Sequence, residues 1–215
     1  MKAHSERLPS AEVQDCFRRL RAHMPGRVEG AKGPKGEADP FRALVACMLS
    51  AQSRDANTRL AADALFRLAD TPQATLALDE AVIARAIRPC GLYNAKARNI
   101  LRMAAALLDR HGGAVPTTRD GLTALPGVGR KCADIMLSFV YDRPVIAVDT
   151  HVFRVANRLR IAPGKNVLQV EMGLEKAVPA AAGTPPVRVK LRPDPDQSFW
   201  MDFYSLSRAF TMAPF

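Results

Sequence analysis

The chain has 215 residues, 48% of them hydrophobic, so it can bury a sizeable core as one domain or two small lobes without disulfides or metals. Its first 24 residues are too charged for a secretory signal, and no apolar run approaches transmembrane length. The cysteines are too far apart for a metal knuckle or a redox pair, so we expect buried free thiols. They are Cys16, Cys47, Cys90 and Cys132. We expect a soluble protein of the reducing cytoplasm, associated with the nucleoid if it is bacterial.

Positive charge is the second feature of the composition. The chain has 31 Lys and Arg against 21 Asp and Glu, a formal net charge of +10. Residues 85–131 hold nine basic and two acidic side chains, so +7 of the excess lies in one stretch. A polyanion is therefore the expected partner, bound with an affinity that falls as salt rises. The alternative is a solvated basic surface with no partner.

The first half of the chain has the pattern of short helices. Ser10 can cap a helix with apolar residues at helical spacing over 13–20. Residues 25–39, rich in Gly, Pro and charge, predict a linker or long loop. Asp39 is then expected to cap a largely apolar, central helix that has Pro40 at its first position. This helix ends in the polar run 50–53, before a third helix.

Proline and glycine mark the boundaries of the next elements. Thr71 and Pro72 predict the start of a short helix, and a further short helix is expected to end at 89–91. A long helix follows residues 92–94 and stops at the glycine pair 112–113.

A glycine hairpin is predicted at 122–131. Leu122 and Leu125 suit a short helical turn, which the Pro-Gly pair at 126–127 interrupts. Two glycines flanking one valine let the backbone approach a partner closely. The apolar segment 133–140 predicts a buried helix after the turn. Such a hairpin leaves backbone N–H groups at a helix N-terminus, where phosphate is a natural ligand. A nucleotide-binding P-loop needs a longer glycine run after a strand, and the simpler alternative is a turn that binds nothing.

The remainder of the chain is also helical in pattern. Asp149, after a short extended run, can cap a helix, and Asn166 can cap another. The Pro-rich segment 179–197 predicts a loop, and aromatic residues at helical spacing predict a last amphipathic helix over 199–210. Strand patterns are almost absent, so the predicted class is all-α.

Two side chains near the hairpin have the chemistry of a catalytic pair. Burial of Lys131 beside Arg130 would favour the neutral amine, a nucleophile that forms Schiff bases. Asp149 lies at a predicted helix N-terminus, where a fixed carboxylate can stabilise an oxocarbenium ion or help to deprotonate the amine. The alternatives are a phosphate contact for Lys131 and an ordinary helix cap for Asp149.

The segments 125–131 (Leu-Pro-Gly-Val-Gly-Arg-Lys) and 148–151 (Val-Asp-Thr-His) resemble the helix-hairpin-helix and the catalytic aspartate of the endonuclease III family of DNA base-excision glycosylases. Agreement in the order of the family covers roughly residues 40 to 179, because several spaced motifs match. They include segments 49–52, 91–96 and 162–167.

This resemblance implies roles for individual residues. Lys131 attacks the sugar C1′ of a flipped nucleotide, and Asp149 assists. The nucleotide must be flipped because the bond to be cut lies inside the base stack. Gln52 and Leu92 fill or wedge the vacated space. The alternatives are a polar residue at a helix end for Gln52 and a core leucine for Leu92. Tyr93 lies near the pocket or simply packs, and His151 supports Asp149 or contacts a phosphate. The hairpin residues implied to contact DNA are Leu125, Gly127, Val128, Gly129 and Arg130, with the backbone N–H groups of Val128 and Gly129 as phosphate donors.

The sequence also departs from the family. The family usually ends in four closely spaced cysteines that hold a four-iron cluster, whereas Cys132 is the last cysteine here. We therefore expect no iron–sulfur cluster and no other cofactor or metal. The helix over 199–210 is expected to replace the cluster loop by docking on the apolar face of 13–20. Cys132 also stands where the family commonly has Thr, next to the proposed nucleophile.

These expectations combine into one prediction. The fold is all-α, with a helical barrel at 34–143, a second lobe from 1–33 and 144–215, and a DNA-binding cleft between them. The protein is a monomeric DNA glycosylase/AP lyase that removes oxidised pyrimidines from double-stranded DNA and cuts abasic sites. The alternatives are a non-catalytic helix-hairpin-helix DNA-binding protein and a monofunctional glycosylase for mismatched or alkylated bases.

Overall fold

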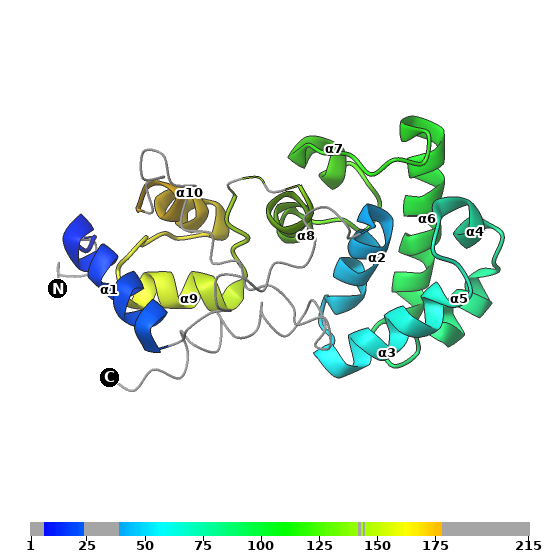
Figure 1. Ribbon diagram of the computed structural model, residues 1–215, viewed down its shortest axis with the longest axis horizontal. Helices are drawn as coiled ribbons and strands as arrows, with labels where there is room; N and C mark the ends of the chain where they lie inside the picture. The colour runs from blue at the N-terminus through cyan, green and yellow to red at the C-terminus, as the bar shows by residue number, and fades with distance from the viewer. Residues whose placement is uncertain (1–6, 24–38, 142, 144, 178–215) are drawn as a thin grey trace. The chain divides into compact units, whose positions relative to one another are not determined.

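The computed structural model describes residues 7–23, 39–141, 143 and 145–177 (Figure 1). This described part is helical throughout and contains no strand, so the all-α prediction is confirmed. The chain divides into two compact units. We call Pro34–Arg143 the hairpin unit, and Met1–Gly33 together with Pro144–Phe215 the terminal unit. No helix of the described part is long and apolar enough to cross a membrane.

The hairpin unit packs its helices around a buried second helix. Its elements are α2 (Pro40–Ser50), α3 (Asp55–Phe66), α4 (Pro72–Leu76), α5 (Glu80–Ala86), α6 (Tyr93–His111), α7 (Arg119–Thr123), α8 (Arg130–Ile135) and the π-helix η1 (Met136–Val140). Figure 1 shows α2 between α8 and α6. Leu44, Val45 and Leu49 of α2 are completely buried, so the prediction of a central apolar helix is confirmed.

Helix starts follow the sequence signals closely. The Asp39 side chain accepts a hydrogen bond from Arg42 N at 2.9 Å, and Pro40 is the first residue of α2. The Thr71 hydroxyl accepts one from Ala74 N at 3.1 Å, with Pro72 beginning α4. Each cap satisfies an amide that has no partner inside its helix. At the other end of the long helix, Gly112 takes the left-handed conformation that stops α6.

The helix after the hairpin changes its winding midway. The segment predicted as one buried helix is α8 for six residues and then the π-helix η1. The wider turn closes with the hydrogen bond from Tyr141 N to Met136 O at 3.2 Å. The Tyr141 hydroxyl also donates to Val115 O at 2.9 Å, which ties the end of the π-helix to the loop before α7.

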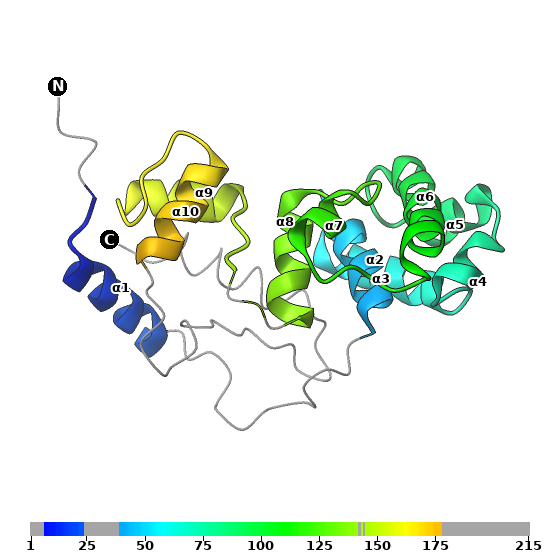
Figure 2. The same cartoon turned by 90° about the horizontal axis from the view of Figure 1, so that it is seen from above.

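The terminal unit has three described helices: α1 (Ser10–His23), α9 (Thr150–Arg158) and α10 (Val167–Ala177). Helices α9 and α10 lie side by side (Figures 1 and 2). Val13 of α1 joins their apolar core, so chain segments from both ends of the sequence share it. Asn166 caps α10 as predicted, accepting from Gln169 N at 2.9 Å. The predicted helix over 199–210, its docking on 13–20 and the predicted linker over 25–38 lie outside the described residues.

Candidate functional site

The hairpin is the turn at residues 124–129 between α7 and α8, and its two glycines have different structural roles. Gly127 has φ +78°, and a Cβ there would lie 2.8 Å from Asn99 Cβ and 2.9 Å from Met48 Cε. Only glycine fits this position without strain. Gly129 has an ordinary extended conformation, and a Cβ there would meet nothing within 4 Å. The fold therefore requires Gly127, whereas the space beside Gly129 is open to a ligand.

The turn is anchored from inside. Leu125 and Val128 are buried at 3% and 6% exposure, so these apolar side chains fix the turn to the core of the unit. Val128 N donates to Leu125 O at 3.1 Å. The turn itself uses this N–H donor here, and the expected contact between the Val128 N–H and phosphate stays a prediction. Gly129, the residue that precedes α8, and the exposed Arg130 remain on the open side.

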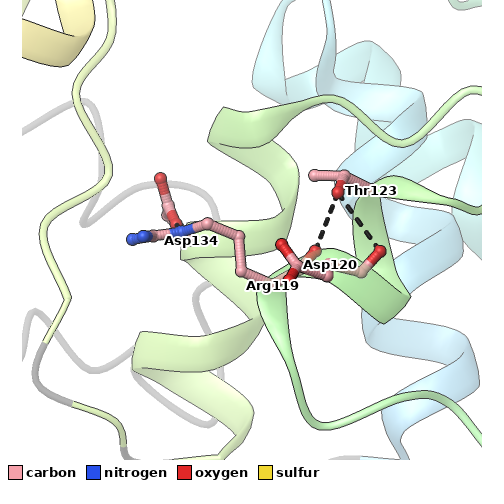
Figure 3. Close-up of polar contacts among 4 residues, drawn as sticks. All are labelled: Arg119, Asp120, Thr123 and Asp134. Atoms are coloured by element: carbon pink, nitrogen blue, oxygen red, sulfur yellow. Dashed lines mark hydrogen bonds and ion pairs between the residues drawn. The ribbon is translucent and has the colours of Figure 1, made fainter.

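An ion pair between a partly exposed arginine and a buried aspartate joins the two helices of the hairpin (Figure 3). Arg119 Nε donates to Asp134 Oδ1 at 2.6 Å, and Asp134 is only 1% exposed. Arg119 begins α7, and the hydroxyl of Thr123 at its other end donates to Arg119 O at 2.9 Å. A buried carboxylate is tolerated because the guanidinium compensates its charge. Sequence reasoning missed this pair, and the available signal was an aspartate inside the apolar segment that follows the hairpin.

Lys131 lies in the first turn of α8, and its side chain is exposed. The burial beside Arg130 that would favour its neutral amine is therefore not observed. Cys132 follows Lys131 in α8, and Cys47 Sγ of α2 lies 4.0 Å from Cys132 O. A hydrogen bond with the Cys132 thiol, together with burial, raises the pKa of Cys47 well above its ordinary value, while the charge of Lys131 acts to lower it. The Lys131 ammonium thus lies near the Cys47–Cys132 pair.

All four cysteines are free, and Cys47 and Cys90 are buried as expected, whereas Cys16 and Cys132 are partly exposed. Since the sequence has no other cysteine, these side chains do not fit the four-cysteine cluster of the resembling family. The described residues also contain no group of three or more His, Cys, Asp or Glu able to hold a metal. The absence of a cofactor stays a prediction, and no step below depends on one.

Gln52 and Leu92 occupy adjacent loops of the hairpin unit. Both have left-handed backbones, with φ of 52° and 57°, which is uncommon for residues other than glycine. Leu92 is 62% exposed, so it is not a core leucine, and Gln52 is exposed as well. A Cβ at Gly91 would lie 3.2 Å from Gln52 O, so the two loops touch. Tyr93, the first residue of α6, is partly exposed beside them.

Lys96 is a buried lysine, to which the sequence analysis gave no role beyond its positive charge and its place in the 91–96 motif. Its Nζ donates to Leu49 O at 2.6 Å and to Ala51 O at 2.7 Å. Burial lowers the pKa of Lys96 from its ordinary value. The available signal was its helical spacing with Ile100, which places a lysine on the apolar stripe of α6.

Asp149 belongs to the terminal unit, whereas Lys131 belongs to the hairpin unit. The Oδ1 atom of Asp149 accepts hydrogen bonds from His151 N and Val152 N, both at 2.9 Å. The predicted cap of α9 is thereby confirmed, and the His151 side chain is partly exposed next to it. This arrangement fixes the carboxylate at a helix N-terminus, where the helix dipole stabilises negative charge.

Comparison with known proteins decides which family this arrangement belongs to. The sequence profile of the HhH-GPD superfamily base excision DNA repair proteins matches residues 45–180. The chain belongs to that superfamily. Its helix-hairpin-helix (HhH) is the α7–hairpin–α8 segment, and the matched region also contains Gln52, Leu92 and Asp149.

Within the superfamily, the chain belongs to the endonuclease III family, so the resemblance drawn from the motifs is confirmed. It is 49% identical to endonuclease III of Escherichia coli K12 over 143 residues, which are 66% of this chain and 68% of that protein. Endonuclease III of Treponema pallidum is 40% identical over 175 residues, which are 80% of this chain and 80% of that protein. A solved structure described as a trapped endonuclease III–DNA covalent intermediate is 38% identical, with a TM-score of 0.71 over 80% of this chain and 79% of that one.

Proposed function

We propose that this protein is a base excision repair DNA glycosylase with AP lyase activity, which removes oxidised pyrimidines from double-stranded DNA as a monomer. The observation that supports this most directly is an exposed lysine, Lys131, one residue beyond Arg130 at the open side of the hairpin, in a chain 49% identical to an endonuclease III. A non-catalytic DNA-binding module has no use for a nucleophile at that position, and a monofunctional glycosylase can do without one.

The chemistry follows from the amine. Lys131 Nζ attacks the sugar C1′ of the flipped nucleotide, and the electron pair of the C1′–N bond leaves with the base, which takes up a proton. Opening of the sugar ring gives a Schiff base between Nζ and C1′. Removal of a C2′ proton then expels the 3′ phosphate by β-elimination, which breaks the strand on the 3′ side of the site.

The other residues act around this centre. The carboxylate of Asp149 stabilises the positive charge that develops on the sugar and assists removal of the proton from the attacking amine. Gln52 and Leu92 enter the space that the flipped base vacates. The open backbone at Gly129, the exposed Arg130 and the partly exposed His151 bind the phosphates that flank the site.

Borohydride trapping tests the central step. The protein is incubated with duplex DNA that contains thymine glycol or an abasic site, and borohydride then reduces the Schiff base to a stable adduct. We expect the adduct with wild type and with Lys176→Ala, an exposed lysine of α10, but not with Lys131→Ala.

Other results would contradict the proposal or favour one of its alternatives. Equal trapping by wild type and Lys131→Ala would refute the lyase mechanism. Base release without strand cleavage would favour a monofunctional glycosylase, and salt-sensitive binding without either reaction would favour a non-catalytic module. Visible absorbance and bound iron in the purified protein would contradict the proposed lack of an iron–sulfur cluster, and a dimer in sedimentation would contradict the monomer.

A further inference from the structure

Lys96 joins the end of one helix to the start of another. Leu49 and Ala51 lie at the C-terminal end of α2, where helix carbonyls have no partner inside the helix. The Lys96 ammonium, in the first turn of α6, donates a short hydrogen bond to each of these two carbonyls. Lys96 itself is only 8% exposed. A cation beside a helix C-terminus is favourable, because the helix dipole is negative there.

The two helix ends joined in this way carry the two side chains proposed to enter DNA. Gln52 directly follows the bonded Ala51, and Lys96 N donates to Leu92 O at 3.0 Å, so Leu92 begins the helical turn that contains Lys96. Both Gln52 and Leu92 hold left-handed backbones. One buried lysine therefore fixes the spacing of both loops.

This arrangement is costly for a contact that serves stability alone. Burying an ammonium loses its hydration, and two left-handed residues other than glycine add backbone strain. The Ser53 hydroxyl, next to Gln52, is buried and has no hydrogen-bond partner among the described residues. Unfavourable features concentrated at one place in a fold are typical of functional sites.

We propose that Lys96 is a positioning residue, which holds Gln52 and Leu92 at the spacing that lets both enter the base stack together. The inference rests on the function proposed above. Lys96 contacts backbone carbonyls of its own chain and takes no part in the bond-making steps. Its loss therefore slows the opening of duplex DNA and leaves the chemistry of Lys131 intact.

Two substrates separate these steps. Duplex DNA with thymine glycol requires the stack to be opened and filled, whereas a single-stranded abasic oligonucleotide offers C1′ to Lys131 without a stack. For Lys96→Met we expect kcat/KM on the duplex to fall by roughly ten- to a hundredfold, because small misplacements of binding groups have effects of this size. We expect cleavage of the single strand to change by less than about twofold. In the Leu92→Ala background the same substitution should add little, since coupled residues are not additive.

Controls separate positioning from general weakening of the fold. Ile83→Val lowers the stability of the same core without touching either carbonyl, and Lys176→Met removes one positive charge from the terminal unit; both should retain the wild-type ratio of duplex to single-strand activity. If Lys96→Met does not fold, Lys96→Gln, which keeps an N–H donor, is measured on the same two substrates. Equal losses on both substrates, no loss on either, or additivity with Leu92→Ala would overturn the inference. A wild type inactive on both substrates would overturn the proposed function, and this inference with it.

Discussion

Leu92 combines two unfavourable properties in one residue. Its side chain is 62% exposed, and its backbone has φ +57° at the position before α6. Because this side chain is exposed, it contributes little hydrophobic stabilisation, and a left-handed conformation costs a residue with a Cβ about 1 kcal/mol or more. The fold alone would favour glycine here, so the proposed entry of this side chain into DNA supplies a reason for leucine.

Leu92→Gly should therefore separate stability from activity. We expect the free energy of unfolding to stay the same or to rise by up to about 1 kcal/mol, because glycine removes the strain. Excision from duplex DNA should fall roughly tenfold, equivalent to about 1.4 kcal/mol, because the wedge is lost. Urea unfolding and single-turnover excision measure the two effects. Arg160→Gly is the matched control, since Arg160 also has a left-handed backbone, with φ +53°, and should change stability alone. A destabilised Leu92→Gly with full activity would contradict both arguments.

Cys47 links the pH dependence of stability to the surroundings of Lys131. The Cys132 thiol and burial raise the pKa of Cys47 well above 9.0, so the folded state keeps this proton when the unfolded chain has lost it. The folded state then binds more protons, and stability falls as pH rises above about 9, by at most about 1.4 kcal/mol per pH unit for this group. Below that pH the stabilising contribution is fully present.

The expected result is a smaller loss of stability at high pH in Cys47→Ala than in wild type. Urea unfolding at about pH 7.5 and pH 9.5 measures the difference for each protein, which removes the constant cost of the deleted side chain. Burial also raises the pKa of the half-buried Cys16, though less, so Cys16→Ala should show a weaker version of the same effect. An identical pH dependence in wild type and Cys47→Ala would show that this thiol does not contribute.

The hairpin is the element whose role can be tested most directly, because one of its glycines serves the fold and the other faces open space. Gly127→Ala should lower the free energy of unfolding by about 2 kcal/mol or more, since a Cβ meets Asn99 and Met48 in a left-handed turn. Gly129→Ala should change it by less than about 0.5 kcal/mol, because the poorer helix cap offsets the lower entropy of the unfolded chain.

Gly129→Ala should lower DNA affinity although it hardly changes stability. A methyl group there occupies the space through which phosphate is proposed to approach, so we expect DNA affinity to fall roughly tenfold while the fold is kept. Chemical denaturation and fluorescence anisotropy with an abasic duplex measure the two quantities. A folded Gly129→Ala that binds as tightly as wild type would refute the backbone approach.

Elements defined by neighbouring residues could be predicted from the sequence, and contacts between distant residues could not. Asp39, Thr71 and Asp149 each cap a helix that begins with the next residue, so a few letters contain the whole signal. The bonds from Lys96 to α2 span more than 40 residues, and nothing near Lys96 indicates those partners. The exposure of Lys131 likewise depends on packing that its neighbours in sequence do not reveal.

At the scale of the whole molecule, the proposed reaction draws on both units. The hairpin unit contains Lys131 and the two loops proposed to enter DNA, and the terminal unit contains Asp149. The family profile over 45–180 extends across both units, and so does the set of motifs that supports the resemblance. The proposed chemistry therefore uses residues of both units. Within it, Asp149 contributes either its charge or only its cap on α9.

Asp149→Asn and Asp149→Ala distinguish charge from cap. Asparagine keeps an oxygen that can accept from His151 N and Val152 N, so stability should change by less than about 0.5 kcal/mol, whereas alanine loses the cap at a cost of about 1 kcal/mol. Both substitutions remove the negative charge, so base release should slow by the same factor in each, on the order of a hundredfold. Single-turnover excision measures the rate, and thermal unfolding measures the cap. If Asp149→Asn excises at the wild-type rate, Asp149 is an ordinary helix cap and another group must stabilise the sugar cation.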